Sequence, residues 1–86
     1  MNSYRNKKKK VAVVTGSSSG IGLETSLLLA RNGFYTYATM RNLEKSKAIS
    51  NLKQKEKLSL EILQLDVNDD ESVKEAIQKI TNEQER

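Results

Sequence analysis

The residues in this sequence that are best suited to chemistry form one glycine- and serine-rich segment, Thr15-Gly16-Ser17-Ser18-Ser19-Gly20-Ile21-Gly22. This segment directly follows the apolar run Val11–Val14. Because glycine lacks a Cβ, it adopts backbone angles closed to other residues and lets the main chain approach an anion closely. A helix that starts here points its unpaired N–H groups and positive dipole end at that anion. The segment therefore predicts a phosphate-binding turn in which the three serines add hydroxyl donors. The alternative is that the glycines only permit a tight turn.

Two further positions are suited to binding the rest of a dinucleotide. Arg41 is the first charged residue after the second predicted strand, and no acid stands there before Glu44. An acid at this place hydrogen-bonds the ribose hydroxyls of NAD, whereas an arginine pairs with the 2′-phosphate of NADP. Arg41 therefore favours NADP, the alternative being a plain surface residue. Asp66 follows the third predicted strand, where its carboxylate can accept from the adenine amino group while Val67 lies against the ring. Its alternative role is that of a turn former or helix cap.

Composition excludes several kinds of site. The 86 residues include neither cysteine nor histidine. Disulfides, thiolate nucleophiles, histidine-based acid–base catalysis and zinc chemistry are therefore excluded, and no metal site is predicted. No apolar stretch approaches the ~20 residues that a membrane span needs. We therefore expect a cytoplasmic chain without a membrane partner.

The net charge of +4 is distributed unevenly. Residues 1–10 carry five positive charges, residues 11–65 a net +3 and residues 66–86 a net −4. As a nucleic-acid patch the basic start needs aromatic support, and Tyr4 alone is near it. We interpret residues 1–10 as a solvated, flexible basic tail and expect no nucleic-acid partner.

From residue 11 onward, predicted strands and helices alternate. Strands are expected at Val11–Thr15, Phe34–Met40 and Leu58–Val67, and helices at Gly20–Asn32, about Leu43–Lys55 and after Asp69 or Asp70. The first and third strands are apolar on both faces, which is typical of strands buried on both sides. This β-α-β-α-β-α order predicts an α/β fold with a parallel sheet, right-handed crossovers and helices on the sheet faces. It corresponds to one mononucleotide-binding half of a doubly wound fold.

The helices have apolar positions at helical spacing. In the first helix Ile21, Thr25 and Leu28 share one face, with Leu27 and Leu29 beside it. The lysines of the second helix indicate an exposed outer face. The apolar positions of the last helix follow an i, i+3, i+4, i+7 pattern, and they are Val73, Ala76, Ile77 and Ile80.

Taken together, Thr15–Gly22, Ala38–Asn42 and Leu65–Val67 resemble the start of the short-chain dehydrogenase/reductase family, over residues 10–86. The resemblance implies a three-layer Rossmann-type half with strand order 3-2-1, truncated before the fourth strand. It implies that Arg41, helped by Ser18 or Ser19, holds the 2′-phosphate and that Asp66 and Val67 hold the adenine. It assigns the phosphate contacts to Gly16, Ser18, Ser19, Gly20, Ile21 and Gly22.

The catalytic segments of this family do not follow in the printed sequence. Members continue into a fourth strand, a catalytic Ser and a Tyr-x-x-x-Lys helix. Tyr4 and Lys8 have that spacing, but they precede the first strand, so we interpret the match as chance. Tyr35 and Tyr37 are expected to be packing residues of the second strand. No catalytic residue is therefore assigned, and whether the chain is itself an enzyme is left open.

We expect residues 11–86 to be the N-terminal half of a Rossmann NADP-binding domain. The parent activity implied is an NADP-dependent oxidoreductase acting on a carbonyl or alcohol, with that small-molecule substrate bound only in a full-length relative. The alternative is a non-catalytic NADP-binding module or an inactive truncated gene product. If the sheet ends at the first strand, that strand is an open edge through which the chain can associate with itself.

Overall fold

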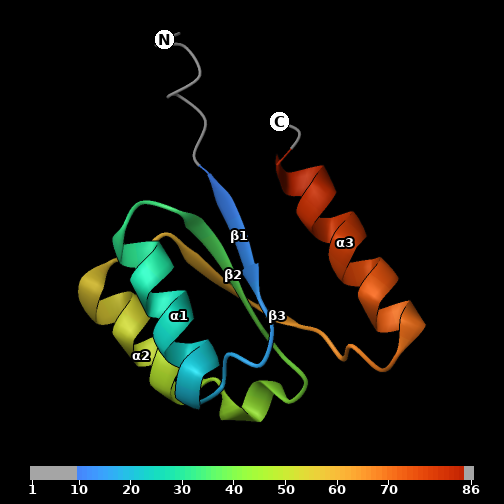
Figure 1. The fold of residues 1–86 in the computed structure, drawn as a ribbon, viewed down its shortest axis with the longest axis horizontal. Helices are drawn as coiled ribbons and strands as arrows, with labels where there is room; N and C mark the ends of the chain where they lie inside the picture. Colours follow the sequence, from blue (N-terminus) through green and yellow to red (C-terminus); the bar gives the residue numbers. More distant parts are fainter. Residues whose placement is uncertain (1–9, 85–86) are drawn as a thin grey trace, which may run out of the picture.

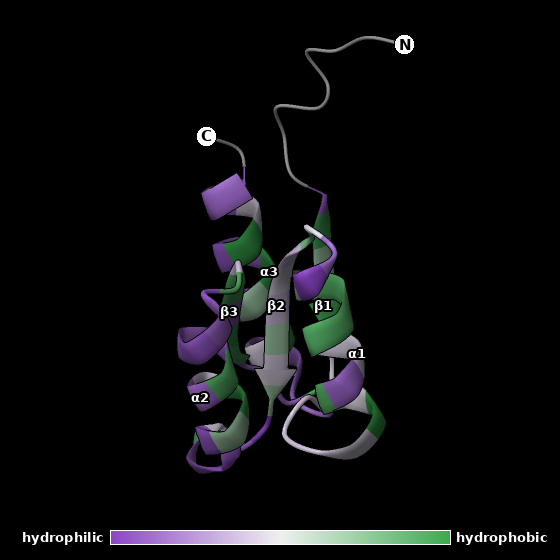
Figure 2. Cartoon of the chain, turned by 90° about the vertical axis from the view of Figure 1, so that its left-hand side faces the viewer, coloured by the Kyte–Doolittle hydropathy of each residue, from purple (hydrophilic) through white to green (hydrophobic). Residues whose placement is uncertain are grey.

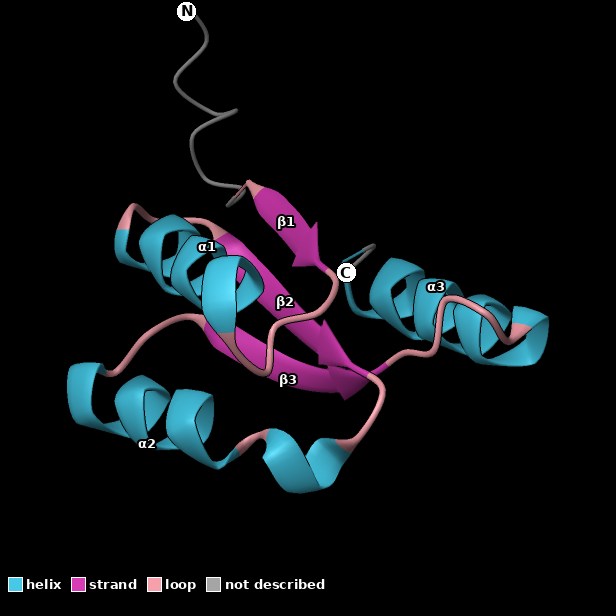
Figure 3. Cartoon of the chain, turned by 60° about the horizontal axis from the view of Figure 1, so that its bottom comes forward, coloured by secondary structure: helices cyan, strands magenta, loops and turns pink. Residues whose placement is uncertain are grey.

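The computed structural model describes residues 10–84, which form a three-stranded sheet between two layers of helices. Figure 1 shows α1 and α2 together on one side of the sheet and α3 on the other, and Figure 3 shows the same three layers from below. Residues 1–9 of the predicted basic tail lie outside the described residues. The elements are, in order, β1 (Val11–Val14), α1 (Gly20–Arg31), β2 (Tyr35–Met40), the short 3-10 helix η2 (Leu43–Lys45), α2 (Lys47–Glu56), β3 (Leu60–Gln64) and α3 (Asp70–Gln84).

The sheet has the order β1-β2-β3, with β2 in the middle and both pairs parallel. Val13 is opposite Tyr37 in the first pair, and Tyr37 is opposite Glu61 in the second. The predicted α/β fold, its parallel sheet and the 3-2-1 order are therefore confirmed. All three strands run the same way, so their carboxyl ends meet at one edge of the sheet.

The second predicted helix is interrupted. Instead of one helix over residues 43–55, the chain forms η2 and then α2, with Ser46 ending the first and starting the second. The side chain of Asn42 accepts a hydrogen bond from the Glu44 N–H at 2.9 Å and so starts the short helix early. Capping side chains of this kind compete with a continuous helix. The break places Lys45 in a separate turn from the lysines of α2.

One hydrophobic core lies between the sheet and the α1–α2 layer. Its fully buried members are contributed by two helices and two strands, and they are Leu27, Ala30, Ala38, Met40, Ile49 and Leu60. In Figure 2 both helices of this layer mix hydrophobic and hydrophilic stretches, as expected for helices with one buried face. Arg31 of α1 and Glu56 of α2 form a two-pronged ion pair, with both N···O distances 2.7 Å, that joins the ends of the two helices.

The face of α1 that carries Ile21 and Leu28 is not its buried face. Ile21 is 86% exposed and Leu28 is 60% exposed, whereas Ser26, Leu27 and Ala30 are buried. Ser26 is buried because its hydroxyl lies within hydrogen-bond distance of Ser17 Oγ (3.0 Å) and the Gly22 carbonyl (2.9 Å). A polar residue, Ser26, therefore lies in the buried stripe of the helix. A pattern based on hydrophobicity alone points instead to the neighbouring stripe that contains Ile21 and Leu28.

Strand β1 is not buried on both faces in the described part of the chain. Val11 and Val13 are 39% and 48% exposed. Their side of the sheet is the one that carries α3, because Val13 and Tyr37 are register partners and Tyr37 contacts α3. α3 packs against β3, which forms the opposite edge of the sheet, and both valines stay exposed. Self-association through this edge stays a prediction.

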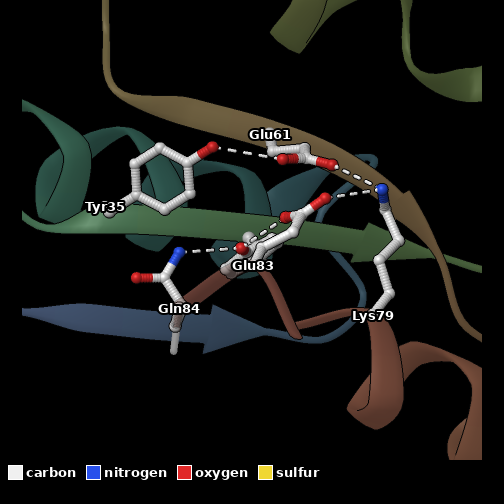
Figure 4. A network of polar contacts seen from close by, with 6 residues as sticks. Tyr35, Glu61, Lys79, Glu83 and Gln84 are labelled. Carbon is white, nitrogen blue, oxygen red and sulfur yellow. Dashed lines mark hydrogen bonds and ion pairs between the residues drawn. The ribbon is translucent and has the colours of Figure 1, made fainter. Parts of the chain in front are cut away.

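Helix α3 is fastened to the sheet by polar contacts. Figure 4 shows the network, in which Tyr37 Oη donates to Glu83 at 2.7 Å and accepts from Gln84 Nε2 at 2.9 Å. Lys79 pairs with Glu83 at 2.8 Å and with Glu61 of β3 at 3.2 Å. The rings of Tyr37 and Tyr35 meet edge to face, with centroids 5.3 Å apart. Both tyrosines are therefore structural, as predicted, and the exposure of Ile77 (58%) shows that only part of the predicted apolar stripe of α3 is covered.

Candidate nucleotide-binding site

A cleft of about 380 Å³ lies at the carboxyl edge of the sheet. Ligands of open α/β folds bind at this edge. Each strand contributes the segment that follows it, and the lining residues are Thr15, Gly16 and Ser18 after β1, Met40, Arg41, Asn42 and Lys45 at β2, and Leu65, Asp66, Val67 and Asn68 after β3.

The three glycines after β1 are required for different structural reasons. Gly16 and Gly20 have φ of +63° and +60°, the left-handed region that L side chains rarely adopt. Gly22 has an ordinary helical conformation, but a Cβ at this position would overlap the carbonyl group of Gly16. The helix therefore starts in direct contact with the turn, and glycine is required for that approach.

Ser17 is fully buried and holds the turn from inside. Its hydroxyl donates to the Val14 carbonyl at 2.9 Å, and its N–H donates to the Thr39 carbonyl at 2.9 Å. Thr39 in turn donates its hydroxyl to the same Val14 carbonyl at 2.8 Å. The expectation that all three serines offer hydroxyls to a phosphate is therefore wrong for Ser17, because its hydroxyl is turned into the protein.

The N-terminus of α1 has no side-chain cap. Ser19 is its N-cap residue in an extended conformation, but its side chain makes no capping hydrogen bond, and the first turn contains no acidic residue. The first N–H groups of a helix have no intrahelical acceptor and carry partial positive charge. This helix end therefore presents donors that suit an external anion.

Arg41 leaves the sheet directly after β2 and is exposed. Its carbonyl accepts a hydrogen bond from Gln64 Nε2 at 3.1 Å, which ties the backbone at this point to the end of β3. Of the ion pairs formed among residues 10–84, none uses Arg41. The guanidinium is thus available at the wall of the cleft.

Asp66 is a turn former that also lines the cleft, and its contact with adenine stays a prediction. One carboxylate oxygen accepts from the Asn68 N–H at 3.0 Å, which makes it a turn former, and the residue also lines the cleft. The cap of α3 is Asp69, whose carboxylate accepts from the N–H groups of Glu71 (3.0 Å) and Ser72 (3.4 Å). Val67, 61% exposed, adds an apolar surface beside Asp66.

The structure brings five of the predicted residues together in this cleft, namely Gly16, Ser18, Arg41, Asp66 and Val67. The other four, which do not line it, lie at the start of α1, and they are Ser19, Gly20, Ile21 and Gly22. Sequence reasoning missed Lys45 and Asn68. The signal for Lys45 was its place four residues after Arg41, behind the capping Asn42.

A family model described as "short chain dehydrogenase" matches residues 10–86. This chain belongs to the short-chain dehydrogenase family. Curated relatives of this chain include a short-chain dehydrogenase/reductase (prx1) of Penicillium roqueforti, 44% identical over 72 residues, which are 83% of this chain and 21% of the relative. An NADPH-dependent 1-acyldihydroxyacetone phosphate reductase of Saccharomyces cerevisiae is 52% identical over 44 residues, 51% of this chain and 15% of the relative. The chain thus spans about a fifth or less of these two relatives.

Solved structures of oxidoreductases also superpose on the chain. A metagenomic short-chain oxidoreductase in complex with NADP has a TM-score of 0.82 at 25% identity, covering 92% of this chain and 36% of that one. YwfH, an NADPH-dependent reductase involved in bacilysin biosynthesis, has a TM-score of 0.79 at 30% identity, covering 92% and 34%.

None of the helices within residues 10–84 is long and apolar enough to cross a membrane. Within the same range there is no group of three or more acidic side chains that could hold a metal ion.

Proposed function

We propose that this short-chain dehydrogenase chain binds NADP(H) and forms the cofactor-binding part of an oxidoreductase that acts on a carbonyl or alcohol. The observation that carries the proposal is the single cleft that joins the glycine turn, Arg41 and Asp66 at the carboxyl ends of three parallel strands. The two NADPH-named reductases and the NADP complex among the similar proteins support the same cofactor.

In this proposal the cofactor phosphates lie against the turn and the uncapped start of α1. The residues that hold them are Gly16, Ser18, Ser19, Gly20, Ile21 and Gly22. Arg41 pairs with the 2′-phosphate, with Ser18 as a neighbouring hydroxyl donor. Asp66 accepts from the adenine amino group, and Val67 covers one face of the ring.

The residues present fit such a group. Because Gly22 has no Cβ, the start of the helix packs directly against the Gly16 carbonyl. A pyrophosphate needs a main chain that it can approach closely in this way. Bound NADPH supplies a hydride to a carbonyl. The described residues bind and orient the cofactor and, through Arg41, select its phosphorylated form.

A second candidate function is cofactor binding without chemistry. Proton transfer to a substrate oxygen needs a positioned acid–base side chain with a pKa near the working pH, and in the family that this chain resembles, this side chain is a tyrosine. Here burial raises the pKa of Tyr37 to about 12, with the Gln84 hydrogen bond opposing this and the Glu83 hydrogen bond adding to it. Burial also raises the pKa of Tyr35. Neither tyrosine of residues 10–84 is therefore suited to that role.

Titration of the 86-residue chain with NADPH and NADH tests the proposal. We expect saturable NADPH binding that is at least ~10-fold tighter than NADH binding, since a paired charge–charge hydrogen bond contributes about 1.5–3 kcal/mol. Arg41→Ala should remove most of this preference. Lys55→Ala is the matched control because it removes an exposed positive charge outside the cleft. Equal affinity for both cofactors, unchanged in Arg41→Ala, contradicts the proposal.

An activity measurement separates the two candidate functions. If the chain binds NADPH, it is then supplied with a panel of aldehydes and ketones while NADPH oxidation is followed. Oxidation that depends on both chain and carbonyl favours the oxidoreductase, whereas binding without oxidation favours the binding module.

A further inference from the structure

The cleft contains a second positive charge. Lys45 lines the same wall as Arg41 and Asn42. The lysines of α2 itself, Lys47, Lys53 and Lys55, line no part of this cleft. Among the lining residues, two cations therefore stand against the one carboxylate of Asp66.

The local backbone explains why Lys45 differs from the lysines of α2. Asn42 stabilises the turn with both its side chain and its backbone. Its side chain accepts a hydrogen bond from the Glu44 N–H at 2.9 Å, and its carbonyl accepts one from the Lys45 N–H at 3.1 Å. The turn then ends at Ser46, so Lys45 is not part of the exposed outer face of α2. In a continuous helix over residues 43–55, Lys45 would belong to the same helix as the lysines of α2.

Both cations of the cleft are available to a ligand. The ion pairs formed within residues 10–84 use Arg31 and Lys79 as their positive partners. Arg41 and Lys45 are exposed and belong to none of these pairs. The Asp66 carboxylate, in contrast, already accepts from the Asn68 N–H.

We infer that Lys45 acts with Arg41 as a second cation for the 2′-phosphate of NADP and so adds to the discrimination against NAD. The inference rests on the proposed function. A phosphate monoester carries a charge of about −1.5 to −2 at pH 7 and offers three acceptor oxygens. A planar guanidinium engages two of these oxygens, which leaves one for the compact point charge of a lysine.

Two small nucleotides isolate this contribution. Adenosine 2′,5′-bisphosphate and adenosine 5′-monophosphate differ only in the 2′-phosphate, and their dissociation constants for the 86-residue chain are measured by calorimetric titration. Lys45→Gln should weaken bisphosphate binding roughly 3- to 10-fold and leave monophosphate binding unchanged, as expected for one exposed charge-assisted contact. Lys45→Arg should keep the preference. Raising the salt concentration should reduce the difference between wild type and Lys45→Gln, because exposed charges are screened.

Lys55→Gln is the matched control, because it removes one exposed lysine charge outside the cleft and should change neither constant. If wild type binds the two nucleotides equally, the proposed NADP function itself is wrong. If wild type prefers the bisphosphate and Lys45→Gln keeps that preference in full, the role of Lys45 is overturned while the proposed function stands. An equal loss in Lys55→Gln also overturns it, since the effect then comes from net charge.

Discussion

Among the helices that follow the carboxyl ends of the strands, α1 and α3 differ in how the N–H groups of their first turns are satisfied. α3 is capped by Asp69 and has Asp70 and Glu71 in its first turn. α1 has no side-chain cap and no acid in its first turn. Every helix start exposes N–H groups that need an acceptor. The protein satisfies this need internally in α3 and leaves it open in α1, where the glycine turn also brings the backbone close. α2 also lacks a side-chain cap and a first-turn acid, so what sets α1 apart is the glycine turn that precedes its open N–H groups.

The largest effect is expected from Gly22→Ala, which disrupts the contact between the start of α1 and the glycine turn. The new Cβ overlaps the Gly16 carbonyl, so the turn must shift. We expect a loss of about 1–3 kcal/mol in the free energy of unfolding, measured with urea, and loss of NADPH binding. Gly33→Ala is the control, because it strains a positive φ far from the cleft with open space around the Cβ. It should lower stability while the folded protein keeps its NADPH affinity.

An alkaline titration should loosen the α3 side of the molecule. Burial raises the pKa of Tyr37 to about 12 from 10.0, so the folded state favours the protonated phenol. This stability is complete below pH 10.0 and is lost as the pH rises through about 12. We expect the free energy of unfolding to fall by about 3 kcal/mol across this window.

Tyr37→Phe is the control for that titration and should remove most of the decline. The remainder is expected from Tyr35, whose pKa is raised by burial, and from Lys79, whose pKa is raised by its hydrogen bonds to Glu83 and Glu61. A decline of the same size in Tyr37→Phe contradicts the assignment to this hydroxyl.

Ser19→Asp converts the open helix start into a capped one. The new carboxylate can accept from the first-turn N–H groups, so the unliganded protein should gain up to about 1 kcal/mol. NADPH binding should weaken by about tenfold, because the carboxylate occupies the donors and repels phosphate. Ser19→Asn separates the two causes, since it caps without a charge and should cost less affinity. Unchanged NADPH affinity in Ser19→Asp would show that the phosphates do not lie at this helix end.

Asp69→Ala gives the smallest effect and tests the capped end. Two N–H groups lose their acceptor, so the free energy of unfolding should fall by about 1 kcal/mol. NADPH affinity, measured by the same titration as above, should not change. A clear loss of affinity contradicts the view that the α3 start serves the fold alone.

Sequence patterns predicted the architecture because the strands are continuous apolar runs separated by helical spacing. Arg41 and Asp66 could be placed together, since parallel strands end at the same edge of a sheet. The inward orientation of Ser17 could not, because it depends on partners at Val14, Ser26 and Thr39 that only the folded crossover brings near.

The misjudged elements share one physical cause. Hydrophobicity selected Ile21 and Leu28 as the buried face of α1, whereas a hydrogen-bonded serine occupies the true buried stripe. Lys45 was grouped with the lysines of α2, because the Asn42 cap that separates it acts through one side-chain hydrogen bond. Local polar contacts of this kind cannot be predicted from the spacing of apolar residues in the sequence.

The Val14 carbonyl accepts hydroxyl hydrogen bonds from Ser17 and Thr39 at once. Both lone pairs of a strand-end oxygen are thus used to join the turn to a strand 25 residues further on in the chain. The turn acquires its shape only when the whole crossover has folded. A ligand that binds the turn therefore binds the native state alone, and the melting temperature of the protein rises with the concentration of that ligand.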